Sequence, residues 1–155
     1  MRRNSGFTMI ELMVTIAIVG ILIAVAVPSF TESMARRSLE GAANELNADL
    51  QYTKSQAVSL NAPISMLTSE HGYIVSRAPA DPNVPTLKTI SLDSKITLTS
   101  PLSVSFDPYR DFASAAITIT LSHTKTSSQL QVKVDAMGRI QMCSPSASFG
   151  GYVPC

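Results

Sequence analysis

Apolar residues run almost without interruption from Phe7 to Val27, and this stretch contains a single charged residue, Glu11. At about 1.5 Å of rise per residue, a helix of this length measures roughly 30 Å, close to the thickness of the hydrocarbon core of a membrane. An acidic side chain at the centre of such a helix costs roughly 2.5–3.5 kcal/mol in lipid. The pattern therefore predicts a membrane helix whose Glu11 needs a partner charge. The alternative is an ordinary membrane anchor in which Glu11 has no function.

The pattern stays helical from Thr31 to Leu60, but it becomes amphipathic. Apolar residues recur at alternating spacings of four and three and form one stripe with a single polar member, while charged residues fall mostly on other faces. Asn61-Ala62-Pro63 ends this helix, and Pro28 is expected to kink it where it leaves the membrane. We expect the stripe to lie on a sheet, although a coiled-coil seam would give the same spacing. Its members are Leu39, Ala43, Leu46, Leu50, Thr53, Ala57 and Leu60.

From residue 63 onward, apolar and polar residues alternate, which is typical of half-buried antiparallel strands. A hairpin turn is expected at Ser69-Glu70-His71-Gly72, and residues 78–85, with three prolines, are expected to form a surface loop. The fold class is therefore predicted to be α+β, with a helix followed by an antiparallel sheet that needs covering. The expected strands are 64–68, 73–76, 95–99, 102–106, 116–121 and 130–134, with a last short strand beginning at 137–140.

Composition and charge narrow the classes of function that this chain could have. The 12 basic and 11 acidic residues give a net charge of +1, so the chain as a whole is not built to bind polyanions. About 125 residues follow the apolar segment, enough for one compact domain. His71 and His123 stand near turns, and no phosphate-binding loop, nucleophile motif or paired-carboxylate pattern accompanies them. We therefore expect no enzyme activity, no cofactor and no metal site.

The segment Gly6-Phe7-Thr8-Met9-Ile10-Glu11 resembles the class III signal sequence of type IV pilins and type II secretion pseudopilins. In that family a prepilin peptidase cleaves after the glycine and methylates the new terminal amine. The resemblance implies that residues 1–6 are a leader peptide, that cleavage falls between Gly6 and Phe7, and that Phe7 becomes N-methylated. Glu11 is then the fifth mature residue, which this family requires for assembly, and Pro28 stands where pilins have their kinking proline. Residues 7–30 become the transmembrane and filament-core helix, and residues 31–155 the periplasmic domain.

The position of the leader also makes physical sense. An ordinary secretory signal is cut after its apolar region at a small-residue site, and residues 28–32 do not form such a site. Cleavage before the apolar run would preserve the membrane helix and leave 10 basic against 11 acidic residues, because Arg2 and Arg3 are lost. It would also create a positive amine at Phe7, with which the Glu11 carboxylate of a neighbouring subunit could pair in a low-dielectric bundle.

Two later stretches, 104–108 and 135–140, resemble the C-terminal half of the minor pilins and pseudopilins called FimT, FimU and GspH. One departure is that Tyr109-Arg110-Asp111 stands where a glycine is expected. The resemblance implies a pilin-like fold and a minor type IV pilin of a Gram-negative inner membrane, incorporated into the pilus or priming it. Its partners would be prepilin peptidase, other pilins and the inner-membrane assembly platform. An H-type pseudopilin of a type II secretion system is the first alternative.

The only two cysteines, Cys143 and Cys155, lie in the C-terminal tail. An even cysteine count in an exported domain favours a disulfide over two unpaired thiols. Such a bond would pin a tail rich in Ser, Gly and Pro. Pilins commonly have a disulfide-bonded C-terminal loop and H-type pseudopilins mostly lack one, so this pair favours a pilus.

A second alternative is a DNA-binding minor pilin for natural transformation. In FimT proteins a Gly-Arg-x-Arg motif supplies phosphate contacts, and the matching stretch here is Gly138-Arg139-Ile140-Gln141. Because phosphate affinity comes from summed charge, replacement of the second arginine by Gln141 should weaken such a site. Lys125 and Lys133 are the nearby cations, and Asp135 opposes them. A strand-end Arg139 on a solvated face, or one paired with Asp135, explains the same residues, so DNA binding is the less favoured function.

Overall fold

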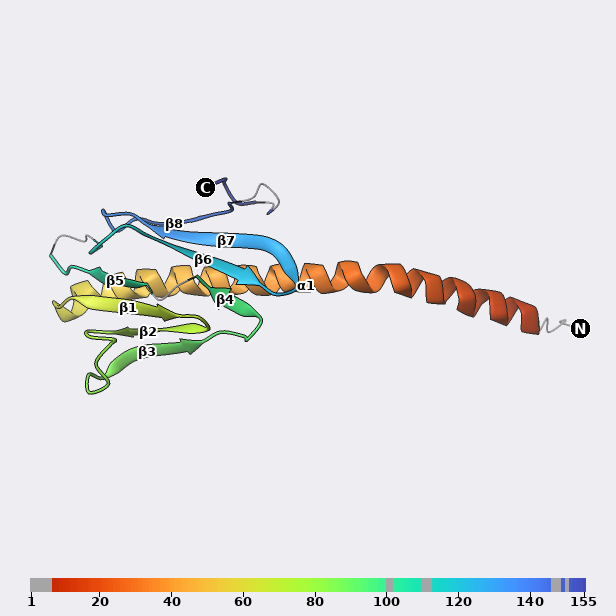
Figure 1. Ribbon diagram of the computed structural model, residues 1–155, viewed down its shortest axis with the longest axis horizontal. Helices are drawn as coiled ribbons and strands as arrows, with labels where there is room; N and C mark the ends of the chain where they lie inside the picture. Colours follow the sequence, from red (N-terminus) through yellow and green to blue (C-terminus); the bar gives the residue numbers. More distant parts are fainter. Residues whose placement is uncertain (1–6, 100–101, 110–112, 146–148, 150) are drawn as a thin grey trace, which may run out of the picture. The chain divides into compact units, whose positions relative to one another are not determined.

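In the part of the chain that the computed structural model describes, one long helix is followed by eight strands (Figure 1). The structure describes residues 7–99, 102–109, 113–145, 149 and 151–155, so the expected leader and Gly6 lie outside it, as does the side chain of Pro28. Two compact units are present, Met1–Met34 and Ala35–Cys155. The division falls four residues later than the expected boundary after residue 30. The kink at Pro28 stays a prediction.

Helix α1 spans Met9–Leu60 and ends as the sequence predicts. Asn61 has a φ of 47°, the left-handed conformation that asparagine tolerates better than most residues. Its N–H donates to the carbonyl of Val58, and the N–H of Ala62 donates to the carbonyl of Ala57, both at 3.2 Å. This pair of bonds is the Schellman motif, which satisfies carbonyls that the end of a helix would otherwise leave unpaired.

The apolar stripe of α1 faces the protein core, as expected, and not a coiled-coil partner. Six of its seven members have no exposed surface, and they belong to one cluster with apolar side chains of the strands, apart from the polar Thr53. Leu60 is the exception, with 40% of its surface exposed. It is the last residue of α1, and the chain turns back at Asn61 directly after it, so this part of the expected stripe was wrong.

The strands form two four-stranded antiparallel sheets rather than a single one. The first has the order β3-β2-β1-β5 and the second the order β4-β6-β7-β8. The sheets separate because β5 pairs with β1 and not with the preceding β4. Figure 1 shows the distal part of α1 running along both sheets. The strands are β1 Ile64–Ser69, β2 Gly72–Ser76, β3 Thr86–Ser91, β4 Ile96–Leu98, β5 Ser103–Phe106, β6 Ile117–His123, β7 Thr126–Val134 and β8 Ile140–Cys143.

Strand β3 was not expected from the sequence. It lies at the edge of the first sheet, and none of its six residues is buried. Only Ile90 packs against the core cluster, so the alternation of apolar and polar residues that reveals the other strands is weak here. The edge position also explains Lys88 in the middle of the strand, because charged residues on an edge strand discourage pairing with other chains.

Gly72, at the start of β2, is fixed by the close approach of β3. A Cβ atom at this position would overlap the backbone carbonyl oxygen of Ile90. We expect Gly72→Ala to lower the free energy of unfolding by about 1–3 kcal/mol, the usual cost of forcing extra volume into a packed region. Urea unfolding of the full chain in detergent measures the change.

Gly41→Ala is the matched control, because a Cβ added there would meet no atom within 4 Å beyond the adjacent residues and the nearby backbone of α1 itself. It should stabilise the chain by up to about 1 kcal/mol through helix propensity. Equal effects of the two substitutions would contradict the proposed crowding at Gly72.

Candidate functional site

The start of α1 places Glu11 within a capping arrangement. The backbone N–H of Glu11 donates to the hydroxyl oxygen of Thr8 at 3.3 Å, and the N–H of Leu12 donates to the carbonyl of Thr8 at 3.2 Å. Thr8 is therefore the N-cap, and Glu11 occupies the third helical position, where an acidic side chain also favours the helix dipole. The sequence contains this signal as Thr-x-x-Glu, which is independent of the assembly role predicted for Glu11.

The apolar segment of α1 has no cover within its own unit. Its large side chains are more than half exposed, from Phe7 at 77% and Met9 at 78% to Val27 at 53%. An 18-residue window of this helix has a mean hydropathy of 2.8, so the helix is long and apolar enough to cross a membrane. Among the described residues, none forms an ion pair with the Glu11 carboxylate. Lipid or other helices must therefore cover this surface, because exposed apolar area of this extent is unfavourable in water.

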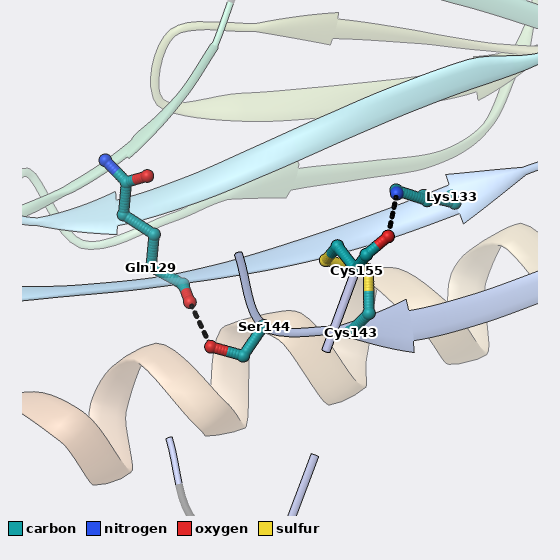
Figure 2. Close-up of a disulfide and its surroundings, with 5 residues drawn as sticks. All are labelled: Gln129, Lys133, Cys143, Ser144 and Cys155. Carbon is teal, nitrogen blue, oxygen red and sulfur yellow. Dashed lines mark hydrogen bonds between the residues drawn. A yellow bond between two sulfur atoms is a disulfide. The ribbon is translucent and has the colours of Figure 1, made fainter. Parts of the chain in front are cut away.

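The C-terminal tail contains the expected disulfide (Figure 2). Cys143 and Cys155 are joined by an S–S bond of 2.07 Å, with Cα atoms 5.0 Å apart. The N–H of Ser144 donates to the carbonyl of Val153, and the N–H of Cys155 donates to the carbonyl of Ser144, so the two ends of the tail lie side by side. Figure 2 also shows the Lys133 amine of β7, which donates to the Cys155 carbonyl at 3.4 Å.

Two aromatic residues attach this tail to the body of the domain. Phe149 is 7% exposed and belongs to the core cluster, and Tyr152 packs edge-on against it with ring centroids 5.7 Å apart. The Tyr152 hydroxyl donates to the Glu40 carboxylate of α1 at 2.9 Å. Partial burial, and then this hydrogen bond and charge, raise the pKa of Tyr152. The tail is thus part of the packed domain and contacts the helix directly.

A buried polar cluster, which the sequence did not reveal, joins α1 to the first sheet. Asp49 is 4% exposed; its carboxylate accepts a hydrogen bond from the Tyr73 hydroxyl of β2 at 2.8 Å and pairs with the Lys88 amine of β3. Burial raises the pKa of Tyr73 above its usual value of 10.0, and the hydrogen bond and charge of Asp49 raise it further. The cluster satisfies a carboxylate that would be costly to bury alone and holds the edge strand β3 against the helix.

The raised pKa of Tyr73 predicts a loss of stability at high pH. Above about pH 10 the unfolded chain releases the tyrosine proton while the native chain keeps it, so stability falls as the pH rises, by up to about 1.4 kcal/mol per pH unit. Tyr73→Phe should lower stability at neutral pH, because a hydrogen bond is lost, and should flatten this decline. Urea midpoints measured between about pH 8 and about pH 11 provide the comparison.

Tyr109→Phe is the control, because Tyr109 is 79% exposed. This variant should retain the full decline of the wild-type chain. A Tyr73→Phe chain whose stability falls as steeply as that of the wild type above pH 10 would contradict the role assigned to Tyr73.

The residues considered for DNA contact are only partly brought together. Lys133 of β7 pairs in register with Gln141 of β8, and both line one hollow with Arg139. The Arg139 backbone N–H donates to the Asp135 carboxylate at 2.9 Å and the Arg139 side chain donates to it at 2.7 Å, and these two bonds lower the pKa of Asp135. Lys125 lies apart, in the turn at the other end of β7. The structure therefore gathers two of the three expected cations and places a carboxylate among them.

Comparison with protein families gives two matches. Residues 42–138, more than half of the chain, match the family described as type II transport protein GspH. Residues 1–27 match the prokaryotic N-terminal methylation motif. The second match covers the proposed cleavage point and Glu11, and the first covers the helix stripe from Ala43 onward and both sheets up to the turn before β8.

Individual relatives resemble parts of the chain. The type IV major pilin protein PilA of Myxococcus xanthus is 47% identical over 53 residues, which are 34% of this chain and 24% of PilA. A fimbrial protein of Pseudomonas aeruginosa is 44% identical over 48 residues, 31% of each chain. This chain therefore spans about a quarter to a third of these relatives. Among solved structures, the type IV minor pilin FimU of P. aeruginosa has the same fold, with a TM-score of 0.59 and 23% identity over 69% of this chain and 89% of FimU.

Proposed function

We propose that this chain, which belongs to the family described as type II transport protein GspH and carries the prokaryotic N-terminal methylation motif, is a minor type IV pilin. In this proposal prepilin peptidase cleaves between Gly6 and Phe7 and methylates the Phe7 amine. The processed chain then enters a pilus or helps to prime its assembly. Its role is structural rather than enzymatic.

The observation that carries this proposal is the division of α1 into two parts with different surroundings. The distal stripe is fully buried in the globular unit, apart from Leu60, whereas the large apolar side chains of the proximal segment are more than half exposed. A helix that is apolar all round must be covered by lipid or by other helices. Lipid before assembly and neighbouring pilin helices after assembly would satisfy this need in turn.

The proposed partners and location follow from the same features. The proximal segment of α1 would lie in the inner membrane of a Gram-negative cell, and residues 31–155 would lie in the periplasm. The Cys143–Cys155 disulfide supports this orientation, because disulfides persist in oxidising compartments. Other pilins and the inner-membrane assembly platform would receive the processed subunit.

A pseudopilin of a type II secretion system is the second candidate, and the description of the matching family favours it. The disulfide-closed tail and the fold of FimU support the pilus instead. Deletion of the encoding gene separates the two functions. A minor pilin predicts loss or reduction of surface filaments with normal export of secreted enzymes, and a pseudopilin predicts the opposite.

The deletion needs a complemented strain as its control. Expression of the wild-type chain should restore filaments, and the chain should be present in filaments sheared from these cells. Normal piliation in the deletion strain, together with a chain that never appears in the sheared fraction, would overturn the proposed function.

A further inference from the structure

Strand β8 lies at an edge of the second sheet, and part of this edge is open. Across the turn between β7 and β8, the backbone N–H of Asp135 donates to the carbonyl of Arg139 at 3.1 Å. Bonded and non-bonded pairs alternate along an antiparallel ladder, so the N–H and C=O groups of Ile140 and Met142 point away from β7. Within the described part of the chain, no hydrogen bond engages these outward groups. Ile140 and Met142 therefore present an open hydrogen-bonding edge.

The C-terminal tail of the chain already pairs with the same edge further along. Ser144 lies two residues beyond Met142, so its backbone groups point to the same side as those of Met142. Its N–H donates to the carbonyl of Val153 at 3.0 Å, and its carbonyl accepts the N–H of Cys155 at 3.1 Å. Ser144 and Pro154 thereby form a parallel bridge. The edge of β8 thus accepts an added strand at Ser144, and the open stretch continues directly from this position.

A groove with apolar surface lies beside the open edge. Its lining residues from α1 follow the spacing of one helical face, and the start of β8 with the preceding turn forms the opposite side. Val58 of α1 is 56% exposed, and Ile140 is only partly buried, so each side contributes apolar surface. The groove therefore has room for a segment that lies along β8. It is lined by Gln51, Lys54, Ser55, Val58, Gly138, Arg139 and Ile140.

The charged groups of this groove are engaged within the chain. The Lys54 amine donates to the Gly138 carbonyl at 3.2 Å, and the Arg139 side chain donates to the Asp135 carboxylate at 2.7 Å. Strand β8 itself contains no charged residue and no proline, which are side-chain features that discourage pairing at an edge. Lys88 supplies such a feature on β3, the edge strand of the first sheet. The groove beside β8 therefore offers backbone groups and apolar surface rather than free charge.

We propose that an extended, uncharged segment of a neighbouring filament subunit adds to the edge of β8 as a further strand. Its backbone pairs with the outward N–H and C=O groups of Ile140 and Met142. Side chains alternate along a strand, so an apolar one covers Val58 while the next points to solvent. Main-chain bonds and apolar burial together supply the affinity. This inference rests on the proposed function, because assembly brings the neighbouring subunit beside the globular unit.

An extended segment fits this edge better than a helix or a nucleic acid. A helix satisfies its backbone groups internally, so it would leave the outward groups of Ile140 and Met142 unpaired. A nucleic acid binds through free cations, whereas the Arg139 side chain is already paired with a carboxylate. Only an extended backbone matches both the open edge and the engaged charges.

Site-specific photo-crosslinking of the full chain in living cells tests the proposal. A lysine derivative whose amine is capped with a diazirine group replaces Val58, because its slim, uncharged side chain leaves the groove open. Position 87 on β3, where Leu87 is 39% exposed, is the control site outside the groove. Sheared filaments are analysed for the presence of each chain, and crosslinked peptides are identified by mass spectrometry. Adducts from position 58 should contain a subunit with an N-terminal methylation motif, crosslinked within an uncharged stretch outside its apolar N-terminal helix.

Ile140→Pro and Ile140→Ala isolate the backbone contribution, because both remove the same side chain. The N–H of Ile140 lies outside the ladder with β7, and proline is tolerated at the first residue of an edge strand. Ile140→Pro removes the outward donor and places its ring in the path of the added strand, so the adduct yield should fall at least about tenfold. Ile140→Ala keeps the N–H and should retain most of the yield.

A second pair of variants leaves β8 untouched. Ser55→Trp fills the groove from the exposed surface of α1 and should lower the adduct yield as strongly as Ile140→Pro. Ser59→Trp, also exposed on α1 but outside the groove lining, is the matched control and should retain the yield. Limited proteolysis of the membrane-bound chain checks the fold of each variant. If Ile140→Pro is cleaved faster than Ile140→Ala, the two tryptophan variants decide.

Several outcomes would overturn the inference. These are a chain present in filaments without adducts at position 58, adducts to DNA or to the apolar helix of a neighbour, and a highly charged crosslinked stretch. Equal yields within the proline and alanine pair, when both are folded, or within the tryptophan pair would also overturn it. All of these outcomes leave the proposed function intact, because the chain is still assembled. Absence of the chain from sheared filaments in every strain would contradict the proposed function and the inference together.

Discussion

Replacement of Glu11 by alanine is expected to leave the chain in the membrane and to reduce its incorporation into filaments by more than about a hundredfold. The proximal segment stays apolar enough to span a membrane, so insertion is unaffected. Assembly suffers because the partner amine of a neighbouring subunit would be buried without its counter-charge, at a cost of about 3–5 kcal/mol. The ratio of the chain in sheared filaments to the chain in membranes measures this effect.

Glu11→Gln separates charge from shape, because the side chain keeps its size and can still accept a hydrogen bond. It should fail in assembly almost as severely as the alanine variant. Glu32→Gln is the matched control, because it neutralises another carboxylate on the exposed surface of α1. This variant should assemble normally. Normal incorporation of both Glu11 variants would contradict the pairing of this carboxylate with a neighbouring amine.

Removal of the disulfide by Cys143→Ser with Cys155→Ser is expected to lower the free energy of unfolding by about 3 kcal/mol, as loop-closure entropy predicts for a loop of this size. The tail would also lose its fixed ends, and with them the position of Phe149 in the core and the contact of Tyr152 with Glu40. Urea unfolding and limited proteolysis of the full chain provide the measurements.

Tyr152→Phe with the disulfide intact is the control for this variant. It removes the hydrogen bond to Glu40 and should cost only about 1 kcal/mol. Cleavage by protease should rise in the tail of the double serine variant and stay low in Tyr152→Phe. A double serine variant as stable and as protease-resistant as the wild type would show that the tail is held by packing alone.

The helix was predictable because its signals are local. The stripe from Leu39 to Ala57 repeats at helical spacing over several turns, and Asn61 with Pro63 marks the end. The disulfide was predictable because only one pairing of two cysteines exists. Residues close together in the sequence therefore determine the helix and its end, and the number of cysteines determines the disulfide.

The division into two sheets and the buried cluster were not predictable in this way. Strand β5 pairs with β1 across more than thirty residues of sequence, and no local pattern reports such a partner. From its position among the charged residues of α1, Asp49 is expected to be exposed. It is buried instead, because Tyr73 and Lys88 from two later strands bind its carboxylate. Long-range pairing therefore limits what a single sequence shows of this fold.

The candidate DNA residues illustrate a related limit. Gly138-Arg139-Ile140-Gln141 could be compared with a motif, but the sequence left Arg139 either solvated or paired with Asp135. In the structure Arg139 is paired with Asp135, and the Lys54 amine of α1 donates to the Gly138 carbonyl. That second contact joins residues 84 positions apart, a separation that no local sequence pattern reports.

The central claim is that this chain is cut after Gly6 and assembled into a filament. Mass spectrometry of the N-terminal peptide, from the chain recovered in sheared filaments, tests it most directly. We predict a peptide that begins at Phe7 and carries one added methyl group on its amine. A chain that retains Met1 to Gly6 in the filament, or one found only in membranes with its leader intact, would contradict the claim.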